Sequence, residues 1–325
     1  MKVAIYGAGA VGGLFGTLLA KQGCEVSAVA RGATAAALRS DGWRLEIDGQ
    51  VIAAKTAVSE NSDELGVQDL VILAVKAPAL ATIAPRLAPL LGRDTILLPA
   101  MNGLPWWFFQ KFGGAFAGMA LESVDPGGAI AAAIPAQHIV GAVLHLTCVT
   151  LAPGVVRHGM GKRIIIGEPG GGSSQRVTAL ARLFTAAGLA AEIAPSVEKE
   201  IWYKLWGNAT MNPISALTGA TCDLILDDPL LEKFILSAMD EAAAIGARIG
   251  CAIGETGAHR NAVTRELGAF KTSMLRDHEA GRPLEIDALL SVVHEIGGKV
   301  DVATPALDAI LGLIRVQQRS RGLYR

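Results

Sequence analysis

The arrangement of apolar and polar positions changes along the chain near Pro195. Before that residue, short continuous apolar runs such as "LVILAV" alternate with helical patterns, which is typical of strands buried in a parallel sheet and of the helices that connect them. After it, helical periodicity recurs in five segments: 196–211, 229–251, 257–280, 285–299 and 305–319. The pattern predicts an α/β domain over residues 1–195 and an all-α domain over residues 196–325.

Several elements of the first domain can be placed more closely. Asp48-Gly49 separates two short alternating runs and predicts a hairpin. The segment "ALATIAPRLAPLL", after Pro78, predicts a helix. The apolar zone from Ala129 to Leu151 contains Pro135 and several polar residues, so we interpret it as buried sheet rather than as a membrane-spanning helix. From about Ala142, antiparallel strands and turns are expected.

Composition excludes several classes of protein. The chain has 325 residues, of which 51% are hydrophobic and 18% charged, which fits two globular domains. Its net charge is −1, and no basic face suggests binding to nucleic acid. Four scattered cysteines form no C-x-x-C pair, which is typical of a reducing compartment, and the six histidines show no metal-binding spacing. No signal peptide or membrane span is recognised. We therefore expect a cytoplasmic protein without a metal site or membrane association.

Three glycines follow the first predicted strand. Gly7, Gly9 and Gly12 form G-x-G-x-x-G at the start of the first helix, where glycine permits a tight turn, the approach of a pyrophosphate and close packing of helix on strand. The motif alone is weak, but its position between a strand and a helix is the required context. A Rossmann-type dinucleotide-binding domain is predicted. The alternative is a glycine-rich turn that binds nothing.

Polar residues follow the next predicted strands. Arg31 lies 19 residues after Gly12, where an NAD site usually has an acid; a cation there suits the 2′-phosphate of NADP(H), although a solvated surface arginine is the alternative. Lys76 and Asn102 follow two apolar strands and are expected at the ligand-binding edge of the sheet. For Lys76, a solvent-facing cap is the alternative.

A polar stripe crosses the segment "IWYKLWGNATMNP". Lys204, Asn208 and Asn212 are spaced four residues apart, so on a helix they project within roughly 80° of one another. The stripe could face water, with Lys204 paired to Glu200. Asparagine is a poor residue for a helix interior, however, and the segment opens the second predicted domain. Both features favour a stripe that lines a binding site.

These motifs together resemble the ketopantoate reductase (2-dehydropantoate 2-reductase) family. The resemblance rests on "GAGAVGG", "LAVKA", "PAMNG", "YKLWGNATMNP" and "SML…LEID", which occur in order over nearly the whole chain. It implies NADPH-dependent reduction of a small 2-oxo acid, foremost 2-dehydropantoate to (R)-pantoate for the synthesis of pantothenate and coenzyme A. NADP(H) is the implied cofactor.

The resemblance also implies roles for individual residues. Lys204 matches the general acid, and Glu285 matches the carboxylate that positions the lysine or the substrate. For Glu285, a helix-start carboxylate after Pro283 is the alternative. The remaining matches are Asn208, Asn212 and Ser273 as substrate contacts, Asn102 beside the nicotinamide and substrate, and Gly7, Gly9, Gly12, Arg31 and Lys76 as cofactor contacts.

Two departures bear on the substrate. Phe270 stands where the family often has an asparagine that binds the substrate. The second departure is the aromatic run from Trp106 to Phe109. It is either part of the core together with a homodimer contact, or a pocket or lid adapted to a more apolar acid. Two alternative functions therefore remain: a related dehydrogenase acting on another 2-oxo or hydroxy acid, and a non-catalytic NADP-sensing protein. A sensor would have no need of Lys204 and Glu285.

Overall fold

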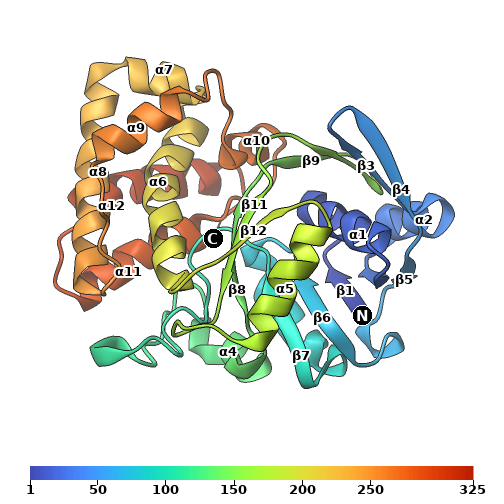
Figure 1. Cartoon of the computed structure of the whole chain (residues 1–325). Helices are drawn as coiled ribbons and strands as arrows, with labels where there is room; N and C mark the ends of the chain where they lie inside the picture. The colour runs from blue at the N-terminus through green and yellow to red at the C-terminus, as the bar shows by residue number, and fades with distance from the viewer. Residues whose placement is uncertain (325) are drawn as a thin grey trace. The chain divides into compact units, whose positions relative to one another are not determined.

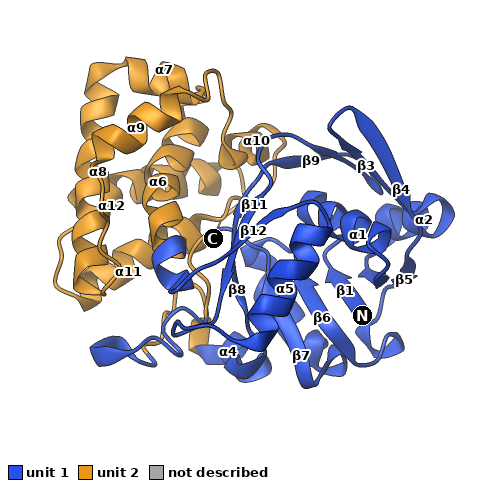
Figure 2. Ribbon diagram, viewed as in Figure 1, with its two compact units in different colours: residues 1–102, 107–118, 128–200 blue, residues 103–106, 119–127, 201–325 orange. Residues whose placement is uncertain are grey.

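The computed structural model describes residues 1–324 and divides into two compact units (Figure 2). Unit 1 contains residues 1–102, 107–118 and 128–200, and unit 2 contains residues 103–106, 119–127 and 201–325. Two short early segments thus pack with the C-terminal helices, although no periodicity in the sequence indicates this. Within the described residues, no helix is both long and apolar enough to cross a membrane.

Unit 1 is built on a parallel five-stranded sheet in the order β5-β2-β1-β6-β7 (Figure 1). Its strands are β1 (Lys2–Tyr6), β2 (Glu25–Val29), β5 (Ala57–Ser59), β6 (Gln68–Leu73) and β7 (Leu91–Pro99). The apolar runs predicted to be strands are confirmed; Val3 pairs with Leu70 and Ile5 with Ile72, and all four side chains are fully buried. The chain crosses from β1 to β2 on one side and later to β6 on the other, which creates a switch point at β1.

Helix α1 (Ala10–Lys21) packs between this sheet and a second one in the order β4-β3-β10-β9. The strands of the second sheet are β3 (Trp43–Ile47), β4 (Gln50–Ala54), β9 (Cys148–Ala152) and β10 (Val155–His158). A Cβ on Gly13 would lie 2.5 Å from Val156 Cγ2, and one on Gly16 would lie 2.9 Å from Trp43 Nε1. These helical glycines therefore let the second sheet close onto α1.

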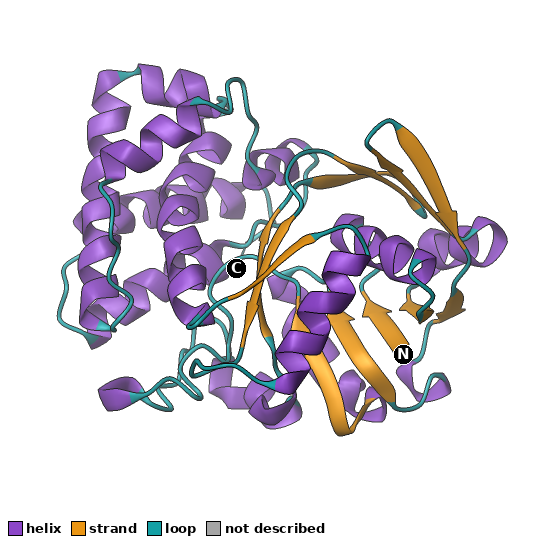
Figure 3. Ribbon diagram, in the orientation of Figure 1, coloured by secondary structure: helices purple, strands orange, loops and turns teal. Residues whose placement is uncertain are grey.

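The hairpin predicted at Asp48-Gly49 is confirmed, since β3 and β4 pair antiparallel and both turn residues have positive φ, 50° and 74°. A third sheet, in the order β12-β11-β8, contains β8 (Gly141–His145), β11 (Arg163–Gly167) and β12 (Ala190–Ile193). Helix α5 (Gln175–Ala186) packs on β12, and its Phe184 ring lies 5.5 Å from that of Phe15 on α1. Figure 3 shows the strands of unit 1 and its helices.

Two predicted elements of unit 1 were partly wrong. The segment after Pro78 is not one helix but α3 (Leu80–Ile83) between two 3₁₀ turns, η2 (Ala77–Ala79) and η3 (Ala84–Leu90), because Pro85 and Pro89 lack the N–H groups a continuous helix needs. The zone predicted as sheet begins with helix α4 (Ala129–Ala133) before β8 and β9 follow. The remaining short elements are α2 (Gly32–Asp41) and the 3₁₀ turns η1 (Ser62–Glu64), η4 (Gly114–Phe116), η5 (Pro126–Gly128) and η6 (Ala136–His138).

The described residues after Pro195 form no strand, as predicted. The helices are α6 (Val197–Thr218), α7 (Cys222–Asp227), α8 (Pro229–Arg248), α9 (Gly257–Arg265), α10 (Ser273–Glu279), the π-helix η7 (Asp287–Ser291), α11 (Val292–Lys299) and α12 (Pro305–Ser320). The segment 257–280, predicted as one helical pattern, is two helices. Gly268 breaks it with a φ of +62°, and Thr272 then caps α10 by accepting a hydrogen bond from the Leu275 N–H at 3.1 Å.

The aromatic run is not helical, so its four adjacent large side chains are not confined to one helix face. Trp107, Phe108 and Phe109 belong to unit 1 and are at most 1% exposed. The rings of Phe108 and Phe109 meet edge to face at 4.8 Å, and Phe112 stacks on Phe108 at 5.5 Å. The packing supports the core interpretation of these three residues.

The glycine turn predicts two different responses to added methyl groups. A Cβ on Gly12 would lie 2.0 Å from the Gly7 carbonyl oxygen, whereas a Cβ on Gly9 meets nothing within 4 Å. We expect Gly12→Ala to lower the free energy of unfolding by about 1–3 kcal/mol and Gly9→Ala to lower it by less than about 1 kcal/mol. Urea denaturation followed by tryptophan fluorescence measures both, and equal midpoints for the two variants would contradict the packing described.

Candidate active site

The carboxyl ends of neighbouring strands bring the first group of predicted residues to one edge of the unit 1 sheet. Gly7 directly follows β1 with a φ of +102°, and its N–H donates to the Val29 carbonyl at the end of β2, 3.4 Å away. A Cβ on Gly7 would lie 2.5 Å from the Ala74 carbonyl oxygen, just beyond β6. Only glycine therefore fits this turn, both in conformation and in space.

The N-terminus of α1 is suited to an anion. Gly9 is the N-cap, no side chain caps this end of the helix, and its first turn carries no acidic residue. The first N–H groups of the helix are thus left for a ligand, and the open space beside Gly9 is where a Cβ would otherwise project. These features fit the pyrophosphate of a dinucleotide, which is the role the glycine motif predicts.

The other predicted cofactor residues lie after strands of the same sheet. Arg31 is exposed at the N-cap of α2, two residues beyond β2, and Lys76 is exposed three residues beyond β6. Asn102, three residues beyond β7, is half-buried. Because parallel strands end at a common edge, Arg31, Lys76 and Asn102 lie on the same side of the sheet as the glycine turn. Their contacts with a cofactor remain a prediction.

Helix α6 has one incompletely buried face in unit 2. From Ile201 to Ala216 every residue is buried except Tyr203, Lys204, Gly207 and Asn208, which share one face; we call these four positions the α6 window. The opposite face carries the two tryptophans, about 160–200° around the helix from Lys204. Trp206 Nε1 donates to the Met239 carbonyl on α8 at 2.8 Å, and Trp202 is 1% exposed. The tryptophans thereby fix which face of α6 remains open.

Lys204 does not behave as a surface lysine. Burial, together with the positive charge of Arg260, lowers the pKa of its amine from 10.5 to about 8, while the negative charge of Glu285 acts in the opposite direction. This burial does not support the interpretation of Lys204 as an exposed lysine paired with Glu200. An amine with this pKa is mostly protonated at neutral pH and can still release its proton, as a general acid must.

Glu285 and the asparagines occupy different surroundings in unit 2. Glu285 is 7% exposed and directly precedes the helical turn that leads into η7, so it is both a helix-start residue and a charge acting on Lys204. Asn208 is part of the α6 window, and Asn212, one turn further, is 8% exposed. Ser273 is exposed as the first residue of α10, and the half-buried ring of Phe270 carries Arg276 over it at 5.9 Å.

Arg260 is a member of this site that sequence reasoning missed. It lies on α9, and its guanidinium carbon is 5.1 Å from the centre of the Tyr203 ring in the α6 window. Its separation of 56 positions from Lys204 falls in no motif, so no signal in a single sequence could have paired the two residues.

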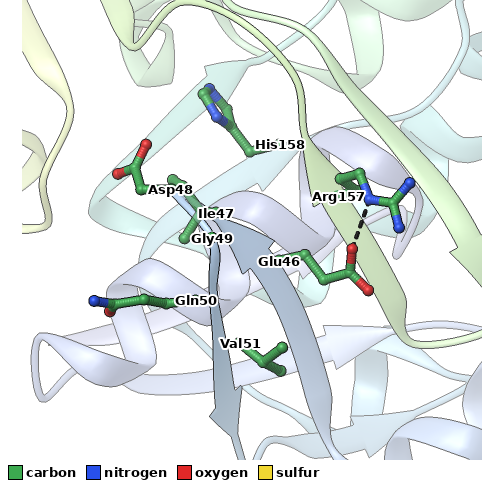
Figure 4. Close-up of a pocket in the computed structure, with 8 residues that line it drawn as sticks. All are labelled: Glu46, Ile47, Asp48, Gly49, Gln50, Val51, Arg157 and His158. Atoms are coloured by element: carbon green, nitrogen blue, oxygen red, sulfur yellow. Dashed lines mark hydrogen bonds and ion pairs between the residues drawn. The ribbon is translucent and has the colours of Figure 1, made fainter.

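A separate hollow in unit 1 is not this site. It is lined by the β3–β4 hairpin together with Arg157 and His158 of β10, and an ion pair of 2.6 Å joins Arg157 to Glu46 along its wall (Figure 4). None of the predicted site residues lines this hollow. Elsewhere in residues 1–324, no group of three or more His, Cys, Asp and Glu is placed to hold a metal ion.

The two charges that act on Lys204 predict opposite changes in its pKa. Glu285→Gln removes a neighbouring negative charge, so the pKa should fall further below about 8, whereas Arg260→Gln removes a neighbouring positive charge, so the pKa should rise towards 10.5. The NMR titration of ¹³C-dimethylated lysines, with Lys204→Ala identifying the signal, measures both shifts. A Lys204 signal that titrates near 10.5 in the wild type would place its amine in water.

Comparison with known proteins agrees with this architecture. The family model described as ketopantoate reductase PanE/ApbA matches residues 3–106, and the model for the C-terminal part of the same family matches residues 196–318. A solved structure from Methylococcus capsulatus, a 2-dehydropantoate 2-reductase, is 28% identical with a TM-score of 0.85 and covers 99% of this chain and 98% of that one.

Two other relatives are more similar. A solved structure from Ralstonia solanacearum, provisionally assigned as a ketopantoate reductase, is 54% identical with a TM-score of 0.96, and 99% of each chain is covered. The 2-dehydropantoate 2-reductase of Mesorhizobium japonicum is 44% identical over 325 residues, which is the full length of both proteins. The chain described here belongs to the ketopantoate reductase family.

Proposed function

We propose that this protein reduces 2-dehydropantoate to pantoate with NADPH and that Lys204 donates the proton. The observation that carries the proposal is the half-buried amine of Lys204, whose pKa is lowered to about 8 in the α6 window. Membership in the family and the 44% identity to a full-length 2-dehydropantoate 2-reductase support the choice of reaction. The glycine turn and the uncapped α1 support the cofactor.

When bound at the glycine turn, NADPH would supply the hydride for the substrate's carbonyl carbon, and negative charge would then build on the carbonyl oxygen. Lys204 donates a hydrogen bond to that oxygen and then transfers its proton, because an ammonium in surroundings with little water stabilises a developing negative charge more strongly than one in bulk solvent. Glu285 favours the protonated amine before the transfer. Above a pH of about 8 the amine is increasingly neutral, so turnover falls on the alkaline side.

The remaining assignments follow from position. Asn208 and Asn212 lie on the same stripe of α6 as Lys204 and can donate hydrogen bonds without adding charge. Ser273 is proposed as a further substrate contact, and Asn102 as a residue beside the nicotinamide and substrate. Arg31 and Lys76 are proposed to hold the phosphates, with Arg31 favouring NADP(H) over NAD(H).

Two further expectations from the sequence also remain proposals. A homodimer is supported by Leu313 and Val316, which are 60% and 64% exposed on α12; sedimentation velocity tests it, and a monomer at high concentration would exclude it. A cytoplasmic location is supported by the four cysteines, all of which are free thiols. Localisation of a tagged protein tests that expectation, and export from the cytoplasm would exclude it.

The first prediction of the proposal concerns turnover. Lys204→Ala should retain NADPH binding and lose roughly 10²–10⁴-fold in kcat, the usual scale for a positioned acid. The decrease in NADPH absorbance with 2-dehydropantoate measures this, and a panel of other 2-oxo acids identifies the preferred substrate. Lys199→Ala, an exposed lysine on the same helix, is the matched control.

Each alternative function has its own outcome in this assay. Faster turnover of a different 2-oxo acid would establish the related dehydrogenase. Binding of NADPH without consumption on any acid would establish the sensor. Full activity of Lys204→Ala would remove the lysine from the mechanism.

The second prediction concerns the cofactor. Arg31→Asp should shift preference from NADPH towards NADH, because a carboxylate repels the 2′-phosphate and can accept a hydrogen bond from a ribose 2′-hydroxyl. The ratio of kcat/KM for the two cofactors measures the shift, with Arg86→Asp, an exposed site elsewhere in unit 1, as the control. Equal use of both cofactors by the wild type would undo the assignment of Arg31.

A further inference from the structure

The guanidinium of Arg260 lies directly on the α6 window. A Cβ built on Gly207 would lie 3.2 Å from its Nε and 3.4 Å from one terminal nitrogen, so the absence of a side chain at Gly207 makes room for the group. The same guanidinium stacks over the Tyr203 ring at 5.1 Å. Tyr203 and Gly207 are the window residues beside Lys204, about 60–100° around the helix. Arg260 therefore borders Lys204 on the side opposite Asn208.

No carboxylate of the described residues forms an ion pair with Arg260, and its Nε is buried without a hydrogen-bond partner. The carboxylate of Glu255, in the loop before α9, accepts a hydrogen bond of 2.5 Å from the Tyr203 hydroxyl and lies 3.4 Å from His259. The Arg260 side chain also hydrogen-bonds to Tyr203. The window thus holds two neighbouring cationic side chains. The negative charge of Glu285 acts on Lys204, whereas no described carboxylate forms an ion pair with Arg260, so a ligand anion beside Arg260 would compensate its charge.

We propose that Arg260 binds the carboxylate of the substrate and so selects anionic 2-oxo acids. The inference rests on the proposed function and names a ligand for the part of the substrate that does not react. A 2-oxo acid carries its carboxylate on the carbon next to the carbonyl, so a cation placed beside Lys204 on the same helix face can hold the carboxylate while Lys204 reaches the carbonyl oxygen. The planar fork of a guanidinium matches the two carboxylate oxygens.

The position of the guanidinium also explains why residue 207 is a glycine. A Cβ there would press on the guanidinium, whose nitrogens would have to shift by a few tenths of an ångström. Gly207→Ala is therefore a variant that keeps both charges and displaces one of them, and it tests placement separately from charge.

The experiment compares a 2-oxo acid with its methyl ester, which keeps the carbonyl but has no negative charge. For Arg260→Gln we expect KM for 2-dehydropantoate to rise about 10–100-fold, the scale of a charged hydrogen-bonded contact, while KM for the ester stays within about twofold of the wild type. Arg260→Lys should recover part of the loss, because it restores the charge but not the fork. Gly207→Ala should raise KM for the acid in the same direction by a smaller factor.

A binding measurement accompanies the kinetics. The dissociation constant of pantoate for the protein saturated with NADP⁺, measured by calorimetry, should rise in Arg260→Gln by the same factor as KM. Arg248→Gln, which removes an exposed arginine at the end of α8, controls for net charge and should leave both quantities unchanged.

The outcomes separate this inference from the proposed function. If the wild type does not consume NADPH when any of the 2-oxo acids is added, the proposed function fails. If the wild type is active and Arg260→Gln leaves KM for the acid unchanged, or raises KM for acid and ester equally, Arg260 only supports the packing of Tyr203 and the inference is overturned.

Discussion

The mechanism proposed for this protein depends on an amine kept partly out of water on one face of a long helix. The two tryptophans of α6 pack towards α8, and the Trp206 indole bonds to a backbone carbonyl there, so the helix cannot rotate without breaking its largest buried contacts. That constraint leaves Lys204 on the incompletely buried face of α6, where burial opposes its charge. The negative charge of Glu285 raises the pKa of the Lys204 amine, and the positive charge of Arg260 lowers it. The resulting pKa near 8 suits a group that must hold a proton at neutral pH and give it up in each turnover.

Fixed groups also favour a charge at the carboxyl edge of the parallel sheet in unit 1. Backbone geometry rather than side chains prepares that edge for an anion. Gly7 fits its turn only because it has no Cβ, and α1 begins without a side-chain cap or an acid. Positive ends of dipoles and unpaired N–H groups attract phosphate without a bound cation. The glycine turn of unit 1 thus fits the pyrophosphate of a dinucleotide.

Local patterns in the sequence predicted the elements whose structure depends on neighbours along the chain. The strand–glycine–helix order at Gly7, the hairpin at Asp48-Gly49 and the switch to helices after Pro195 are all of this kind. The predictions were wrong where a helical pattern continued across residues that interrupt a helix. Prolines divide the segment after Pro78, and a glycine divides the segment 257–280. The relation of Arg260 to Gly207 could not be predicted, because it joins two helices through a tertiary contact. The burial of the aromatic run likewise depended on a turn that no repeat in the sequence signals.

The most direct test of the central claim is a crystal structure of the protein with NADP⁺ and pantoate bound. The account predicts that the Lys204 amine lies within hydrogen-bond distance, about 2.7–3.2 Å, of the hydroxyl oxygen formed by reduction. A structure in which pantoate is bound beside the nicotinamide while the Lys204 amine points into bulk solvent, with another group donating to that oxygen, would contradict it.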